Sequence, residues 1–143
     1  MKYYFSYLEK IKNAIDLFPQ SEMFCSAGMG KSSKGVYKER VINKYKNQVL
    51  LFDFFENPHV FLHTSATIVS KIDFLKTDGF PVGMRRNQDF ALFFSLALIT
   101  PVVYCGFPLS IYVGGIEGQV TSIDIGKNLT MLEHVINRYN LVY

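Results

Sequence analysis

The chain has no tryptophan, and it has only two cysteines and three histidines among its 143 residues. Because a disulfide scaffold needs several cysteines, the fold must rely on a hydrophobic core. Cys25 and Cys105 stand in apolar surroundings, and we predict buried free thiols. His59, His63 and His134 lack the close spacing typical of metal ligands, so we expect no metal site built by this chain.

The sequence also has only a small excess of positive over negative charge. The net charge is only +3 and the basic residues are not gathered into one stripe, which argues against a nucleic-acid-binding protein. The N-terminal segment soon becomes amphipathic and charged, so we expect no signal peptide and a cytoplasmic location. Hydrophobic residues at 49% against 19% charged ones indicate a folded chain, and its length predicts a single domain over residues 1–143.

One long stretch, Phe90 to Val113, carries no charge over 24 residues, which is the length of a membrane span. However, Pro101, Gly106 and Pro108 divide it into pieces that are too short to cross a bilayer. We therefore predict a buried helix from Gln88 to about Ile99, then short strands over 102–105 and 109–113 around a turn. A small membrane-inserted protein is the alternative interpretation.

The rest of the sequence predicts an α/β fold. A helical stripe over residues 3–18 (Tyr4, Tyr7, Leu8, Ile11, Ile15 and Phe18) ends at Pro19. After it we expect a strand over 22–27, a loop over 28–35, an exposed ribbon or loop over 37–46, an apolar segment over 49–55, a buried strand over 60–69, a short helix capped by Ser70 and ended by Gly79, and a final amphipathic helix over 127–139.

The segment Gly28 to Ser33 resembles a phosphate-binding P-loop. That motif needs a glycine where Cys25 stands and a helix that starts at Lys31, whereas Ser33-Lys34-Gly35 has the composition of a loop. We predict a solvated hairpin loop and no nucleotide hydrolysis. The sequence also contains no local signature of a Ser-His-Asp or Cys-His catalytic arrangement.

A polar, basic loop leads into the apolar stretch. Arg85 and Arg86 precede Asn87, the predicted N-cap, and guanidinium groups beside a helix N-terminus favour an anion. Asp89 is the only charged residue between Arg86 and Glu117. It is either an acid that stabilises the helix dipole by about 0.3–1 kcal/mol or a reacting group. Local chemistry leaves both interpretations open.

Several segments, taken in order, resemble the C-terminal half of family-2 glycosyltransferases. They are Thr64 to Leu75, Gly79-Phe80-Pro81, Gln88-Asp89 and Pro108 to Tyr112. The resemblance covers about residues 5–122. It implies a partial GT-A sheet, which is Rossmann-like, with flanking helices. The implied activity is inverting transfer of a sugar from a nucleotide sugar to a glycan or lipid-linked acceptor, with peripheral association at the inner membrane face.

The resemblance assigns a role to Asp89. The aspartate at this position in the family is the usual general base, which takes the proton from an acceptor hydroxyl as the oxygen attacks the anomeric carbon. Gln88, Thr64 and Ser65 belong to the segments that carry the resemblance, and we expect them to contact substrate. We add the arginine pair 85–86 as groups that steer an anionic acceptor or a diphosphate.

Three departures from the family pattern limit what this chain does alone. Gln88 stands where the family has glutamate, and Ser95 stands where many members keep an arginine. The Asp-Asp-Gly-Ser and Asp-x-Asp stretches, which bind the nucleotide sugar and its Mg²⁺ or Mn²⁺, are absent. We therefore expect no cofactor bound by this chain alone, and a missing N-terminal half or a second copy as partner. A non-catalytic remnant or interaction module is the alternative.

Overall fold

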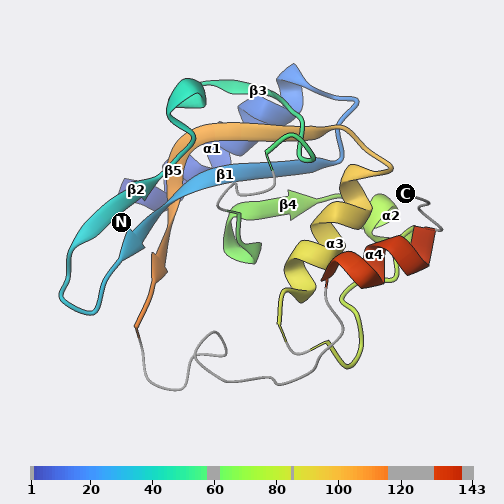
Figure 1. Ribbon diagram of the computed structural model, residues 1–143. Coiled ribbons are helices and arrows are strands. Elements are labelled where there is room, and N and C mark those ends of the chain that lie inside the picture. The colour runs from blue at the N-terminus through green and yellow to red at the C-terminus, as the bar shows by residue number, and fades with distance from the viewer. Residues whose placement is uncertain (1, 58–61, 85, 116–130, 140–143) are drawn as a thin grey trace.

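The computed structural model describes residues 2–57, 62–84, 86–115 and 131–139. This part of the chain is a small mixed α/β domain with flanking helices, as predicted (Figure 1), whereas the partial GT-A sheet stays a prediction. Its elements follow one another in the order α1 (Lys2–Leu17), β1 (Met23–Lys31), β2 (Tyr37–Arg40), the 3-10 turn η1 (Asn43–Tyr45), β3 (Val49–Phe52), the 3-10 turn η2 (Thr64–Ala66), β4 (Thr67–Val69), α2 (Lys71–Leu75), α3 (Gln88–Ala97), β5 (Val102–Val113) and α4 (Met131–Tyr139).

Strand β1 lies at the centre of a mixed sheet in the order β2-β1-β5-β3. On one edge it pairs in parallel with β5. On the other edge Met23–Cys25 pairs with β4 and Gly28–Lys31 pairs with β2, both antiparallel. Strand β3 pairs only with residues 102–105 of β5. The parallel pair at the centre needs a long crossover, which the chain between β1 and β5 supplies.

Helices cover both faces of this sheet. On one face Ile11 and Ala14 of α1 pack against Phe24, Val103 and Cys105 of the central strands. The opposite face packs against α3 through Met23, Cys25, Tyr104, Leu92, Phe93 and Leu96. Figure 1 shows α1 behind the strands, with α3 and α4 on the near side. Consecutive residues of a strand thus serve two cores, as the alternation of side chains along a strand requires.

An aromatic cluster fills the space between β3 and α3. The rings of Phe52 and Tyr104 lie 5.2 Å apart, and those of Phe54 and Phe94 lie 4.8 Å apart and perpendicular. Aromatic pairs at these distances add to the stabilisation from burial. Burial also raises the pKa of Tyr104 to about 12. Several of the many phenylalanines in the sequence therefore belong to this core.

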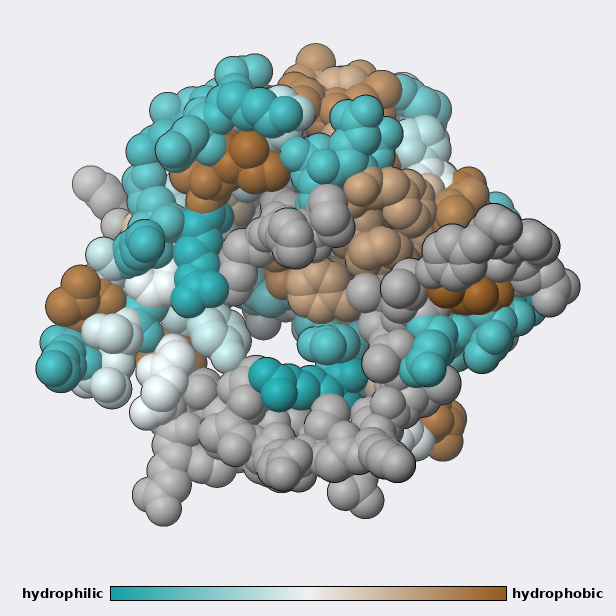
Figure 2. Space-filling model, viewed as in Figure 1, coloured by the Kyte–Doolittle hydropathy of each residue, from teal (hydrophilic) through white to brown (hydrophobic). Residues whose placement is uncertain are grey.

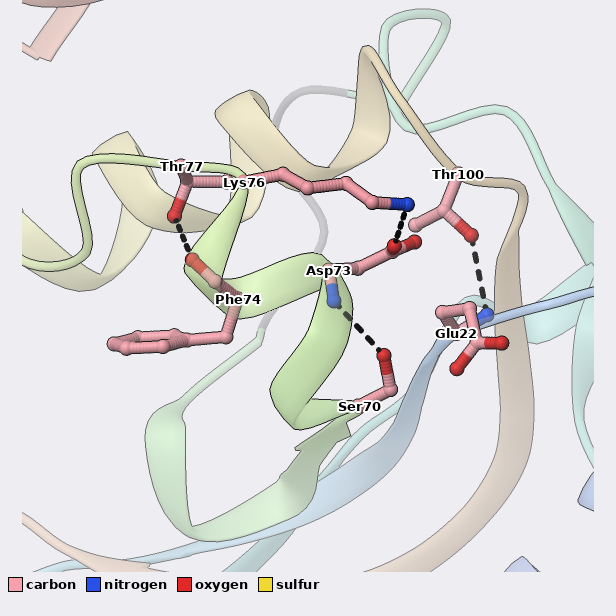
Figure 3. A network of polar contacts seen from close by, with 7 residues as sticks. All are labelled: Glu22, Ser70, Asp73, Phe74, Lys76, Thr77 and Thr100. Atoms are coloured by element: carbon pink, nitrogen blue, oxygen red, sulfur yellow. Dashed lines mark hydrogen bonds and ion pairs between the residues drawn. The ribbon is translucent and has the colours of Figure 1, made fainter.

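A polar network fixes the start of α2 and confirms the predicted cap (Figure 3). Ser70 Oγ accepts a hydrogen bond from Asp73 N at 3.1 Å, and Lys76 Nζ lies 2.5 Å from Asp73 Oδ1. Ser70 N donates to Glu22 O at 2.8 Å, and Glu22 N donates to Thr100 Oγ1 at 3.1 Å. These bonds join α2, the start of β1 and the connection between α3 and β5.

The glycine-rich segment after Ala27 was predicted as a loop, and this prediction is wrong for Gly28 to Lys31. These residues continue β1 and pair with both β2 and β5. The hairpin turn is shorter and spans Ser32 to Gly35, where Gly35 has φ +76° and its N–H donates to Ser32 O at 2.9 Å. No helix follows Lys31, so the rejection of a P-loop stands.

The predicted turn over Gly106 to Pro108 is also wrong, because β5 runs through it. Gly106 exchanges backbone hydrogen bonds with the segment after η1: its N–H donates to Gln48 O at 2.8 Å and its carbonyl accepts from Asn47 N at 2.9 Å. Pro108 is tolerated because it lies beyond the residues that pair with β3, at a register shift in the pairing with β1.

Three further predictions need correction. Residues 64–66 form a 3-10 turn, and only Thr67–Val69 of the predicted strand 60–69 is extended; residues 58–61 lie outside the described part. The helix over 71–75 ends before Gly79, which instead has φ +65° in the following loop. In α1 the buried residue after Ile11 is Ala14, whereas Leu8 and Ile15 are 67% and 41% exposed.

Helices were also predicted at the C-terminus, over 127–139, and at the start of the apolar stretch, over 88–99. Helix α4 confirms the predicted helix over 131–139, with Val135 buried; its predicted beginning at 127–130 lies outside the described residues. Helix α3 ends at Ala97 and is followed by β5. Among the described residues, no helix combines the length and the apolar character that crossing a membrane requires.

Candidate functional site

Asp89 lies in the first turn of α3. Asn87 stands at the N-cap position, as predicted, but it has φ +63° and its side chain makes no capping hydrogen bond. Instead Asp89 Oδ1 accepts from Phe90 N at 2.9 Å, so this acid binds an amide at the start of the helix. The side chain is only half-buried. Asp89 is therefore a helix N-terminal acid in a position that solvent reaches.

The charge of Asp89 acts on His63, which comes from the segment just before η2. His63 Nε2 lies 2.8 Å from Ser110 Oγ, and its ring meets the ring of Tyr112 edge-on at 6.2 Å. Burial lowers the pKa of His63, the carboxylate of Asp89 opposes that change, and the guanidinium of Arg40 adds to it. We call His63, Ser110, Tyr112 and Asp89 the His63 cluster.

Two glycines of β1 lie beside the strand residues of this cluster. In the parallel register Gly28 is opposite Ser110, and Gly30 is opposite Tyr112. Arg40 Nε lies only 2.8 Å from the place that a Cβ on Gly30 would occupy. The absence of a side chain at Gly30 therefore leaves room for the Arg40 side chain, whose charge acts on His63.

Figure 2 shows the face of the molecule that carries α3. Hydrophilic surface lies along β2 and also at the lower centre, close to the first turn of α3 in Figure 1. The cluster offers a carboxylate, a neutral imidazole at pH 7 and a hydroxyl in one place. Such groups suit the binding of a ligand with several hydroxyls and the removal of a proton from one of them.

The structure brings together some of the residues predicted from the sequence. Thr64 and Ser65 form the exposed start of η2, directly after His63, whose pKa responds to the charge of Asp89. Gln88 adjoins Asp89 and is half-buried, and Arg86 is exposed. Arg85 lies outside the described residues.

The sequence did not indicate roles for the other residues of the His63 cluster or for Arg40. His63 was considered as a possible metal ligand, and Arg40 was given no role within the predicted exposed ribbon or loop over 37–46. Ser110 and Tyr112 lie inside a segment that carried the resemblance, and His63 immediately precedes another. The position of these residues in or next to the segments that resemble the family was the one feature of the sequence that pointed to them.

A cavity of about 820 Å³ adjoins the cluster. Its walls are Tyr7 and Leu8 of α1, Met29 of β1, Tyr37 of β2 and residues 108–111 of β5. Ser65 lines it as well. Because Ser110 lines the cavity and also contacts His63, the cavity and the His63 cluster share a boundary.

In the described part of the chain, no group of three or more histidine, cysteine, aspartate or glutamate side chains is placed to hold a metal ion. The two cysteines are buried and unpaired, as predicted. Comparison with protein-family models, curated proteins and solved structures gives no match for this chain. The case for a function therefore rests on the geometry of the site.

Proposed function

We propose that this chain is the acceptor-side half of a glycosyltransferase similar to those of family 2, with Asp89 as the general base. The observation that supports this most is the position of Asp89. It is half-buried at the start of α3, and its charge acts on His63, which contacts Ser110 Oγ and leads into the exposed Thr64 and Ser65. An acceptor hydroxyl beside the carboxylate would meet several hydrogen-bonding groups.

The chemical step requires Asp89 to accept a proton from an acceptor hydroxyl. The acceptor oxygen forms a bond to the anomeric carbon of the sugar on the face opposite the diphosphate, and the bond from that carbon to the diphosphate oxygen breaks. The transfer therefore inverts the anomeric configuration. His63, which burial keeps neutral at pH 7, orients a hydroxyl by hydrogen bonding, and Arg86 attracts an anionic acceptor.

The donor is proposed to bind to a partner. The described residues offer no set of ligands for Mg²⁺ or Mn²⁺, and we assign that metal to a separate donor-binding half. Strand β4 pairs with β1 in the described part of the sheet, and its other edge is a place where a partner strand could add. The partner is a donor-binding half or a second copy of this chain.

The experiment combines this chain with the donor-binding half of a family-2 glycosyltransferase and measures transfer from a nucleotide sugar with Mn²⁺. Asp89→Asn should lower transfer by about 10²–10⁴-fold, the usual contribution of a general base. An asparagine oxygen can still accept from Phe90 N, so the start of α3 and the melting temperature should be preserved. Asp16→Asn, which changes an exposed acid of α1 paired with Lys12, is the matched control.

One observation favours a second candidate, a non-catalytic interaction module. The hydrogen bond from Phe90 N gives Asp89 a structural role that needs no reaction. Normal transfer by Asp89→Asn would end its assignment as the base. Calorimetry with a sugar nucleotide and Mn²⁺ provides the second test: if the combined halves neither bind the donor nor transfer sugar, the non-catalytic alternative holds.

A further inference from the structure

We propose that the outer edge of β2 binds an extended acidic segment of another protein, which adds to the sheet as a further strand. This interaction is independent of the reaction assigned to Asp89, and it uses none of the residues of the His63 cluster. Three features of β2 support it: unpaired backbone groups along its outer edge, an excess of positive charge around them, and the exposure of both.

The outer edge of β2 carries backbone groups that the sheet does not use. Strand β2 is the last strand on its side of the sheet (Figure 1). Ser32 N donates to Val36 O at 2.9 Å, and inward and outward groups alternate along an antiparallel strand, so the N–H and C=O groups of Tyr37 and Glu39 point away from β1. In the part of the chain that the structure describes, no residue forms a hydrogen bond with these four groups. Another strand can add to such an edge.

The segment that contains this edge is strongly basic. From Lys31 to Lys46 it has six basic residues and one acidic residue, a net charge of +5, whereas the other nine basic and eleven acidic residues of the chain give −2. The one acid, Glu39, forms an ion pair with Lys46. Lys34 and Lys38 are exposed, and Figure 2 shows hydrophilic surface along β2. The charge around the edge is therefore complementary to carboxylates.

The backbone groups and the charge together favour one kind of partner. The phosphates of a nucleic acid accept hydrogen bonds but donate none, so they leave the outward C=O groups of Tyr37 and Glu39 without partners. A second copy of β2 would bring Lys38 close to like charges, which destabilise a pair of strands. An extended acidic segment supplies backbone donors and acceptors at the spacing of a strand, and its carboxylates face the lysines.

Lysines on an edge strand also have a protective role, because they discourage apolar strands of other chains from adding to it. Protection alone predicts that no strand binds, whereas the proposal predicts that an acidic strand binds selectively. The edge also offers apolar contacts, since Val36 is 64% exposed and Tyr37 is 50% exposed. A strand that adds here would cover these side chains as well as the backbone groups.

The test is calorimetric binding of a synthetic eight-residue peptide that alternates glutamate with valine. The same peptide with glutamine in place of glutamate should bind about tenfold more weakly. The acidic peptide methylated at every backbone nitrogen keeps the charge but cannot form a strand, so it should not bind. Amide hydrogen exchange followed by NMR should show that the acidic peptide slows exchange of the Tyr37 and Glu39 N–H groups. The N–H of Lys38, which faces Gly30 of β1, should change little.

The charge has its own test. Lys38→Glu should weaken binding of the acidic peptide about three- to tenfold, whereas Lys71→Glu, at an exposed lysine of α2, should leave it unchanged. The proposal is overturned if the acidic peptide does not bind, if the methylated peptide binds equally well, or if the Tyr37 and Glu39 amides stay unprotected. Equally tight binding of an eight-nucleotide thymidine strand, or dimers of this chain that protect the same amides, would also overturn it. None of these outcomes depends on transfer activity, so failure here is distinguishable from failure of the Asp89 assignment.

Discussion

Replacing Gly106 of β5 by alanine should destabilise the fold strongly, because there is no room for a side chain at this position. A Cβ at this position would lie 1.8 Å from the carbonyl oxygen of Tyr45 and 2.8 Å from its carbonyl carbon. The Tyr45 oxygen is not free to move, because it accepts a hydrogen bond from Gln48 N at 3.1 Å. Asn47, in the same turn, has φ +61°. Gly106→Ala must therefore displace a tight turn or distort β5.

The expected loss of stability follows from these contacts. Separating a Cβ and a backbone oxygen that start 1.8 Å apart breaks the two hydrogen bonds that Gly106 exchanges with Asn47 and Gln48. Each such bond contributes about 0.5–1.5 kcal/mol, and overpacking a well-packed site costs about 1–3 kcal/mol. The reduced entropy of the unfolded alanine chain offsets about 0.4–1 kcal/mol. We expect Gly106→Ala to lower the free energy of unfolding by roughly 2–4 kcal/mol.

Urea denaturation followed by far-ultraviolet circular dichroism measures this change. Gly114→Ala is the matched control, because a Cβ there would lie 3.6 Å from the Tyr112 ring, an ordinary contact. The control should change the midpoint little, whereas Gly106→Ala should shift it strongly with the slope unchanged. Equal midpoints for the two variants would refute the reasoning, since it rests entirely on the close approach of the Tyr45 carbonyl.

The remaining predictions concern titration. Burial lowers the pKa of His63 from its ordinary 6.5, so the unfolded chain binds the proton more readily and the free energy of unfolding should fall as pH drops below about 6.5. His63→Gln should flatten this slope between pH 7 and 5 in urea titrations, and an unchanged slope would contradict the burial of the ring. Burial also raises the pKa of Cys105 to about 11 and that of Cys25 further above its ordinary value. Neither thiol should react with a disulfide reagent in the folded protein at pH 8, and both should react in urea; fast labelling without urea would contradict the burial.

Local patterns in the sequence predicted several elements well. The Ser70 cap formed as expected because its hydrogen bond to Asp73 N involves residues only three apart. The helix that begins at Gln88 also followed from local signals, namely a polar start and the stop before Pro101. The α1 stripe was misplaced because apolar periodicity alone does not show that Ala14, a small residue, packs closest to the sheet.

The candidate site was harder to predict because its parts are distant in sequence. His63 and Ser110 are 47 residues apart and meet only because β5 pairs with β1 beside η2. The glycines of residues 28–30 were interpreted as loop residues, since glycine usually interrupts a strand. In the structure Gly30 leaves room for Arg40, a tertiary reason that no local pattern contains.

The parallel pairing of β1 with β5 has a consequence for how the chain folds. Cys25 Sγ donates to Val103 O across 78 positions of sequence. Closing a loop of that length costs about 4 kcal/mol of chain entropy, so the central contact forms late and folding is slow. At roughly 5–20 residues per second, the ribosome takes about 4–16 s to deliver β5 after β1. During that time the edge of β1 that pairs with β5 has no partner strand, and the backbone groups along it are accessible to chaperones.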